Sequence, residues 1–181
     1  IMSQIKVDSI VPRGGLPGGA SGGGIIQMVS VIKTDEFSTT NQSWTDITGL
    51  SVNITPQSSS HKILVMYSVQ VSAQASTYSA GIRLMRGSTA IFIGDEIHGS
   101  NERRASNWVF TSNDPYSDRN LWPCNGTYLD SPGSASQQTY KLQTISGYSG
   151  ADVNINGARG GANNDWSGSG ASTITVMEVS V

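Results

Sequence analysis

The residues of this chain best suited to acid–base chemistry are its two histidines, because imidazole titrates close to physiological pH. His61 and His98 each stand in a polar stretch of the sequence. His98 lies near Asp95, Glu96 and Glu102, and one imidazole with three carboxylates supplies atoms that can bind a metal ion. A single histidine among loop carboxylates is more often simply solvated. We therefore expect no bound metal at this point of the chain.

A second group of polar side chains offers oxygen ligands of the kind that calcium prefers. Its members, all between residues 112 and 130, are Asn113, Asp114, Asp118, Asn120, Asn125 and Asp130. Their spacing matches no calcium-binding loop, so we interpret them as turn-forming residues. The single cysteine, Cys124, cannot form an internal disulfide. It is either a small buried hydrophobe or a surface thiol, and no neighbouring residue in the sequence would activate it.

Sequence motifs for hydrolysis and for nucleotide binding are missing. Residues 147–150 lack the spacing of a nucleophile elbow. No glycine run is followed by Gly-Lys-Ser or Gly-Lys-Thr, and residues 157–161 do not match the dinucleotide-binding fingerprint. We expect a protein that is not an enzyme and that binds no cofactor.

The composition narrows the choice of partners. Only 13% of the residues are charged, far below the usual quarter or so, and the formal net charge is −2 with scattered Lys and Arg. This pattern argues against nucleic acid as a partner. No apolar stretch approaches the roughly 20 residues that cross a bilayer, and no export signal is evident. The sequence predicts a protein made in the cytoplasm with no membrane partner.

Residues 1–24 differ sharply from the rest of the chain. From Arg13 to Gly24 there are seven glycines, and such a stretch cannot recover its ordering entropy by burying side chains. Before it lies a short apolar strip that can add as a strand or wedge to another protein. The strip consists of Ile5, Val7, Ile10 and Val11. We expect residues 1–24 to be an extended anchor or linker; the alternative is a frayed terminus.

From residue 25 onward the apolar residues follow the period of β-strands, and no stretch of ten or more shows helical spacing. Residues 62–71 give the strongest signal and are expected to cross the middle of a sheet. Residues 44–54 suggest a short edge hairpin or bend, and 112–136 a long loop. Gly87-Ser88 joins two strands as a hairpin turn. The other expected strands lie at 25–32, 80–86, 89–93, 107–111, 139–146, 153–155 and 171–181.

Eight to ten strands in about 155 residues favour two packed sheets. We predict an all-β jelly-roll sandwich over residues 25–181, with an immunoglobulin-like sandwich as the alternative.

Several segments resemble tail-fibre-like and appendage proteins of tailed phages, especially marine and cyanobacterial ones. They are residues 2–10 (MSQIKVDSI), 37–40 (FSTT), 44–52 (WTDITGLSV), 62–65 (KILV) and 173–179 (TITVMEV). The resemblance implies a trimeric jelly roll, similar to the tumour-necrosis-factor and C1q folds, on a virion as a fibre, knob or neck appendage. It also implies that the anchor binds other virion proteins. Residues 72–170 match none of these proteins.

Several functions remain open at this point. One is an appendage that attaches the virion to its host through a surface glycan or protein. Another is a capsid decoration, cement or neck protein that touches no receptor. A secreted C1q-like binding protein and an enzyme are less well supported, because the export signal, cysteine pairs and catalytic motifs are missing.

Aromatic side chains supply the candidate contact residues, since aromatics carry much of the energy of protein interfaces. The candidates for the trimer interface, each of which could instead be ordinary core, are Tyr67, Tyr78, Trp108, Phe110, Tyr140 and Tyr148. Loop aromatics stack on sugar rings and amides hydrogen-bond to hydroxyls. The candidates for glycan contact are Tyr116, Trp122, Tyr128, Asn163, Asn164 and Trp166.

Overall fold

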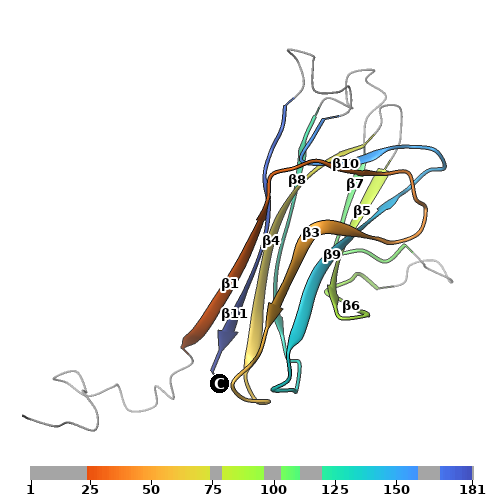
Figure 1. Cartoon of the computed structure of the whole chain (residues 1–181). Helices are drawn as coiled ribbons and strands as arrows, with labels where there is room; N and C mark the ends of the chain where they lie inside the picture. Colours follow the sequence, from red (N-terminus) through yellow and green to blue (C-terminus); the bar gives the residue numbers. More distant parts are fainter. Residues whose placement is uncertain (1–23, 74–78, 96–102, 111–119, 159–167, 181) are drawn as a thin grey trace, which may run out of the picture.

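The computed structural model describes residues 24–73, 79–95, 103–110, 120–158 and 168–180, and these form strands joined by turns and loops (Figure 1). The described residues include no helix, and therefore none long and apolar enough to cross a membrane. The strands are β1 (Ile25–Lys33), β2 (Phe37–Thr39), β3 (Thr45–Ile54), β4 (Lys62–Ala73), β5 (Ser79–Arg86), β6 (Thr89–Ile91), β7 (Asn107–Phe110), β8 (Trp122–Asp130), β9 (Gln138–Ser146), β10 (Val153–Ile155) and β11 (Ser172–Val179).

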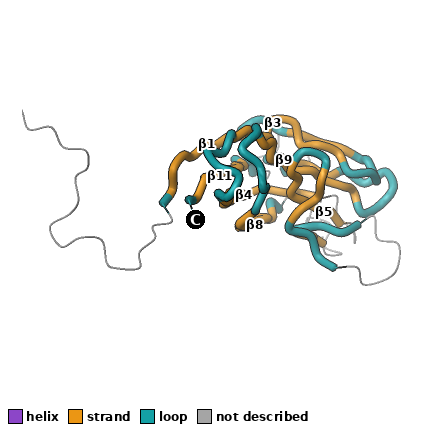
Figure 2. Tube along the Cα trace, turned by 90° about the horizontal axis from the view of Figure 1, so that it is seen from below, coloured by secondary structure: helices purple, strands orange, loops and turns teal. Residues whose placement is uncertain are grey.

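The strands form two antiparallel sheets that pack face to face. Sheet A has the order β1-β11-β4-β10-β2, with β8 also paired to β4, and sheet B has the order β3-β9-β5-β6, with β7 also paired to β5. Figure 2 shows β1, β11, β4 and β8 in one row and β3, β9 and β5 in another. The expected all-β sandwich is confirmed.

The connectivity of the long strands is that of a jelly roll. Leaving aside the short strands β2, β6 and β10, eight strands remain, and in chain order the first, eighth, third and sixth form sheet A. The second, seventh, fourth and fifth form sheet B. Strands that follow each other in the chain thus mostly lie in different sheets, as two interlocked Greek keys require.

Alternating side chains from both sheets fill the space between them. Along β11, for example, Ser172, Ile174, Val176 and Glu178 are buried, whereas the residues between them are partly exposed. The period of two arises because successive side chains of a strand point to opposite faces. One face of each sheet therefore supplies the core, and the other face is left for solvent or a partner.

The segment 44–54 differs from the expected hairpin or bend. It is the single strand β3, whose register against β9 shifts between Asp46 and Ser51. Gly49 lies in this irregular stretch with φ of +89°, a conformation that glycine adopts without steric cost. The Thr48-Gly49 pair thus marks a bulge within one strand.

The expected loop at 112–136 is also partly wrong, because nine of its residues form β8, which pairs with β4 along its whole length. Turn-forming residues such as Asn125 and Gly126 concealed this strand. Gly126 is required by packing and not by a turn, because a Cβ atom at this position would overlap the ring of Tyr67. Pro123 is tolerated because β8 lies on an edge of sheet A, where a backbone N–H is not needed for the ladder.

Candidate functional site

The outer face of sheet A carries rows of side chains that run across four strands. Because β1, β11, β4 and β8 are paired in register, residues directly opposite each other lie side by side. The row that begins at Met28 in β1 is wholly apolar and consists of Met28, Met177, Leu64 and Leu129.

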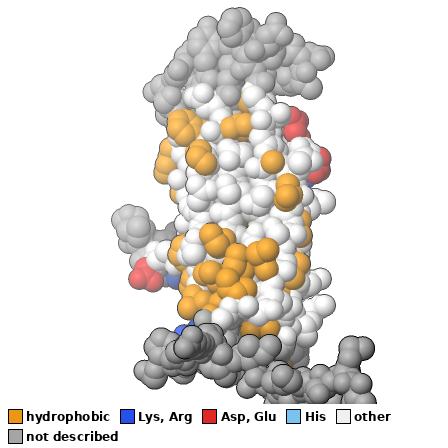
Figure 3. All heavy atoms as spheres, turned by 90° about the vertical axis from the view of Figure 1, so that its left-hand side faces the viewer, with side chains coloured by type: hydrophobic (Ala, Val, Ile, Leu, Met, Phe, Trp, Pro, Cys, Tyr) orange, Lys and Arg blue, Asp and Glu red, His pale blue; other side chains and the backbone are white. Residues whose placement is uncertain are grey.

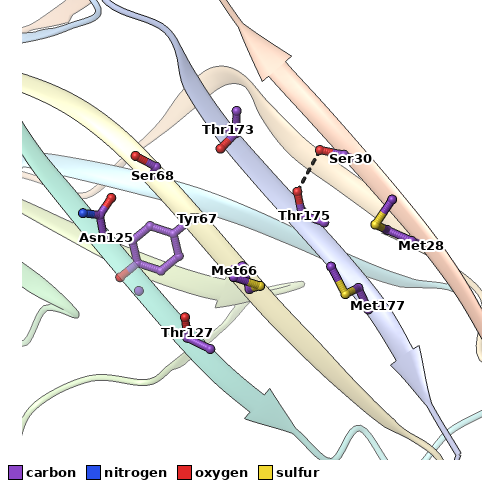
Figure 4. Close-up of a pocket in the computed structure, with 11 residues that line it drawn as sticks. Met28, Ser30, Met66, Tyr67, Ser68, Asn125, Thr127, Thr173, Thr175 and Met177 are labelled. Carbon is purple, nitrogen blue, oxygen red and sulfur yellow. Dashed lines mark hydrogen bonds between the residues drawn. The ribbon is translucent and has the colours of Figure 1, made fainter. Parts of the chain in front are cut away.

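The next two rows become more polar. The second consists of Ser30, Thr175, Met66 and Thr127, and the third of Ile32, Thr173, Ser68 and Asn125. The hydroxyls of Ser30 and Thr175 hydrogen-bond to each other at 2.7 Å (Figure 4). The hydroxyl and amide groups leave this part of the face polar but uncharged.

A shallow groove of about 480 Å³ runs over these rows. It is lined by Met28, Ser30, Met66, Tyr67, Ser68, Asn125, Gly126, Thr127, Thr173, Thr175 and Met177. Figure 4 shows the three methionines grouped on neighbouring strands at one end of the groove. Met28 is 61% exposed, Met66 42% and Leu129 47%.

No residue of the three rows carries a charge. Figure 3 shows a broad apolar patch on this face, with the charged side chains in view confined to its margins. We name the three rows the methionine face. Its apolar part, the first row together with Met66, is an exposed patch of the kind that marks an interaction surface, and flexible methionine side chains adapt well to a packed partner.

The methionine face lies beside the point where residues 1–23 join the sandwich. The N–H of Gly24 donates to Oγ of Ser180 at 2.9 Å, which fixes the start of β1 against the end of β11. Lys62, the first residue of β4, pairs with Val179 at the same end. The predicted anchor therefore enters at the apolar end of the face.

At the end of the sandwich opposite Gly24 lie the end of β4, the start of β5, the end of β7 and the start of β8. Trp122 at the start of β8 pairs with Val71 near the end of β4, and Phe110 at the end of β7 pairs with Ser79 at the start of β5. The described residues that flank 74–78 and 111–119 thus lie at this end, away from Gly24 (Figure 1).

Two of the aromatic residues expected at a trimer interface belong instead to the core of the single chain. Tyr67 and Tyr140 are buried between the sheets, which agrees with the alternative of ordinary core for these two residues. Trp108, Phe110 and Tyr148 are partly or largely exposed. Trp108 and Phe110 lie on the outer face of sheet B, not on the methionine face. Tyr78 lies outside the described residues.

The predicted glycan contacts are not brought together in the described part of the chain. Trp122 is 37% exposed at the beginning of β8. Tyr128 is half-buried further along β8 and stacks on Phe92, with ring centroids 5.4 Å apart. Tyr116, Asn163, Asn164 and Trp166 lie outside the described residues, as do the anchor residues Ile5, Val7, Ile10 and Val11.

Of the two histidines that the sequence singled out, His61 has a structural partner in the described part of the chain. Nδ1 of His61 lies 2.6 Å from Oε1 of the buried Glu178. The same carboxylate accepts hydrogen bonds from Nε2 of Gln27 at 2.5 Å and from the N–H of Gln57 at 2.7 Å. Burial alone would raise the pKa of Glu178, but these donors outweigh it and lower the pKa below the ordinary value of 4.5.

Asp130, one of the possible calcium ligands, is likewise held by protein groups. Nη1 of Arg86 donates to both of its carboxylate oxygens, at 2.9 and 2.8 Å, and the hydroxyl of Tyr140 donates to Oδ2 at 2.7 Å. These contacts tie β5, β8 and β9 together across the sandwich. Within the described residues no three His, Cys, Asp or Glu side chains gather as metal ligands, and the stretch containing His98 is not described.

Of the two possibilities for Cys124, the structure supports the buried hydrophobe. The side chain belongs to the core between the sheets, and burial raises the pKa of its thiol to about 11.

The methionine face itself was missed from the sequence. Met28, Met66 and Met177 are far apart in the chain, and only the strand pairing brings them together. The available signal was that each stands at an outward position of an alternating strand; the residues on both sides are buried for Met66 and Met177 and partly buried for Met28.

Comparisons with known proteins assign no family to this chain. No model of a protein family matches the chain, and no curated protein matches it. Among solved structures it is similar to VP2 in the crystal structure of the infectious bursal disease virus VP2 subviral particle, with 14% identity and a TM-score of 0.30. The alignment covers 84% of this chain and 39% of that one, so the chain spans about two-fifths of its length. A likeness of this size carries no argument about function.

Proposed function

We propose that this chain is a virion structural protein: a trimeric jelly-roll head on a tail fibre or neck appendage, held to the particle by residues 1–24 and contributing to host attachment. The resemblance of five segments to phage appendage proteins suggests the setting. The observation that carries the proposal is the methionine face, an uncharged, groove-bearing surface on the outer side of sheet A whose apolar end is formed by Met28, Met177, Leu64 and Leu129.

Such a face is costly to leave in water. Covering a methionine or leucine side chain contributes about 1.5–3 kcal/mol, and Met28, Met66 and Leu129 are all substantially exposed in the single chain. In a closed ring of three copies the contacts are heterologous, so a different surface of the neighbouring copy packs on this face, and the same face is covered in all three subunits. We therefore assign the trimer contact to the methionine face, in place of the aromatic residues expected from the sequence.

The two ends of the sandwich suit an appendage. The chain enters at Gly24, on the end nearest the methionine face, and the residues that flank 74–78 and 111–119 lie at the far end. An anchor at one end leaves the other end directed away from the particle. Loops at a free end are well placed to meet a host surface.

Two charge insertions test the trimer contact. Met66→Glu places a carboxylate inside the proposed contact, where burying an unpaired charge is strongly unfavourable. We expect light scattering to give this variant the mass of a single folded chain. Phe110→Glu, on the outer face of sheet B, should keep the mass of the wild type. Dissociation by Phe110→Glu with an intact Met66→Glu oligomer would move the contact to sheet B.

The place on the virion is tested with the full chain and a shortened one. Labelled antibody on intact particles should mark the tail or neck, and removing residues 2–24 should leave a folded oligomer that no longer joins particles. Label on the head lattice would favour a capsid decoration or cement protein with no receptor. Incorporation of the shortened chain would overturn the anchor assignment.

A further inference from the structure

The outer face of sheet B carries a tryptophan held against the backbone by a glycine. Trp108 on β7 lies directly opposite Gly81 on β5. A Cβ atom at Gly81 would come within 2.5 Å of Cζ3 of Trp108 and within 2.7 Å of Cε3, so only glycine allows the indole to rest there. Cγ2 of Ile145 on β9 lies under the same spot. The indole is thus seated on the sheet and its position is fixed by the strands.

A second aromatic ring extends this surface. The ring centroid of Phe110 lies 6.3 Å from that of Trp108, and the two planes are tilted by 50°. Phe110 is 70% exposed, although it belongs to a strand and not to a loop tip. Together the rings form an apolar platform that faces outward from sheet B.

Gly81, the residue opposite Trp108, lies two residues before Arg83 on β5. A ladder of planar polar side chains begins at Arg83 and crosses to β9 and β3. Nε of Arg83 donates to Oε1 of Gln143 at 2.8 Å, and Nε2 of Gln143 donates to Oδ1 of Asp46 at 2.6 Å. The guanidinium of Arg83 also lies 4.3 Å from the ring centroid of Trp44. The three polar groups are held in order by their own contacts across β5, β9 and β3.

We propose that this face of sheet B binds an oligosaccharide, with a sugar ring stacked on Trp108 and Phe110 and its hydroxyls hydrogen-bonded by the Asp46–Gln143–Arg83 ladder. A sugar ring has an apolar face of C–H groups and an equatorial belt of hydroxyls. An aromatic platform beside a row of guanidinium, amide and carboxylate groups matches both features. The indole and the ladder are positioned before binding, so little ordering entropy is lost.

The chemical difference between the two outer faces of the sandwich supports the assignment of self-association to sheet A and of sugar binding to sheet B. The methionine face has flexible apolar side chains and no charge, which suits another copy of the chain. The sheet B face combines aromatic rings with charged and amide groups, including Lys141, whose Nζ lies 2.6 Å from Oδ2 of Asp46. The inference deepens the proposed host attachment and rests on it for the source of the sugar, a bacterial surface polysaccharide.

Binding is tested with the full chain on an array of purified bacterial capsular and lipopolysaccharide O-chain polysaccharides. We expect the wild type to bind at least one of them. Trp108→Ala should lower that binding at least tenfold, because it removes the platform. Gly81→Ala, which changes none of the proposed contact residues but displaces the indole of Trp108, should weaken binding as well. Trp122→Ala, a partly exposed tryptophan at the start of β8, is the matched control and should bind as the wild type does.

Folding of each variant is checked by its far-ultraviolet circular dichroism and its mass in solution. A folded Trp108→Ala protein that binds as tightly as the wild type would overturn the inference. So would loss of binding only in Trp122→Ala, which places the sugar at the loop end, or failure of the wild type to bind any polysaccharide. The mass in solution reports on the trimer independently, so failure of the sugar site and failure of the proposed assembly give different results.

Discussion

At the scale of single residues, two side chains that the sequence offered for acid–base or metal chemistry, His61 and Asp130, lie in contacts that stabilise the fold. Glu178 illustrates this, because its buried carboxylate accepts hydrogen bonds from Gln27 and Gln57 and contacts His61, linking β1 and β11 to the turn before β4. A fully buried carboxylate needs such partners, since an unpaired charge in the core is very unfavourable. His61 is therefore explained by packing.

Glu178→Gln should destabilise the protein by about 1.5–3 kcal/mol at neutral pH, because a neutral amide is a weaker acceptor for the same donors. The pKa of Glu178 is lowered in the folded state, so its stabilisation is present above the ordinary value of 4.5 and is lost as the pH falls through the lower folded-state value. Acidification should therefore lower the melting temperature of the wild type more than that of the variant. Parallel acid profiles of the two proteins would contradict this assignment.

Cys124 should resist modification in the folded protein. With a thiol pKa of about 11 and a buried side chain, only about one thiol in a thousand is ionised at pH 8. Reaction with a chromogenic disulfide reagent should be slow in buffer and fast in urea. Equal rates in the two solutions would show that the thiol is accessible in the folded state.

At the scale of elements, β8 shows how a glycine within a strand makes room for a side chain of the neighbouring strand. Gly126 leaves room for the ring of Tyr67, whose hydroxyl donates to Oδ1 of Asn107 at 2.6 Å. The glycine thus allows β4, β7 and β8 to meet around one buried tyrosine.

Gly126→Ala should cost about 1–3 kcal/mol, the usual penalty of overpacking a core. Urea unfolding measures it, and Gly24→Ala provides the matched control, because a Cβ at Gly24 would have no atom within 4 Å. Unchanged urea midpoints for both variants would mean that Tyr67 moves aside freely.

Much of the fold could be predicted from local patterns, and the failures have physical causes. Strands such as β4 and β11 alternate strongly, because one side faces the core along their whole length. The strand β8 was mistaken for a loop because its turn-forming residues Asn125 and Gly126 are tolerated through pairing with β4 and contact with Tyr67. Local propensity contains neither of these long-range effects.

The candidate surfaces were harder to predict than the strands. The residues of the methionine face come from four strands, and the seat of Trp108 depends on Gly81, a residue in another strand. Nothing in the spacing of these residues along the chain brings them together. Tyr67 and Tyr140 were expected at an interface because aromatic residues suit interfaces and cores alike, and the sequence did not separate the two.

At the scale of the whole molecule, the sandwich has two dissimilar outer faces and two dissimilar ends. Sheet A presents the methionine face, and sheet B presents the aromatic platform with its polar ladder. The chain enters at one end, and the flanks of 74–78 and 111–119 lie at the other. In the proposed assembly, sister copies cover the first face and leave the second open to the surroundings.

The mass of the full-length wild-type chain in solution, followed over a wide range of dilution, tests this account most directly. The proposed trimer predicts about 57 kDa, three times the 19.1 kDa of one chain. A species of 19.1 kDa that persists at high protein concentration, with the sandwich intact, would contradict it.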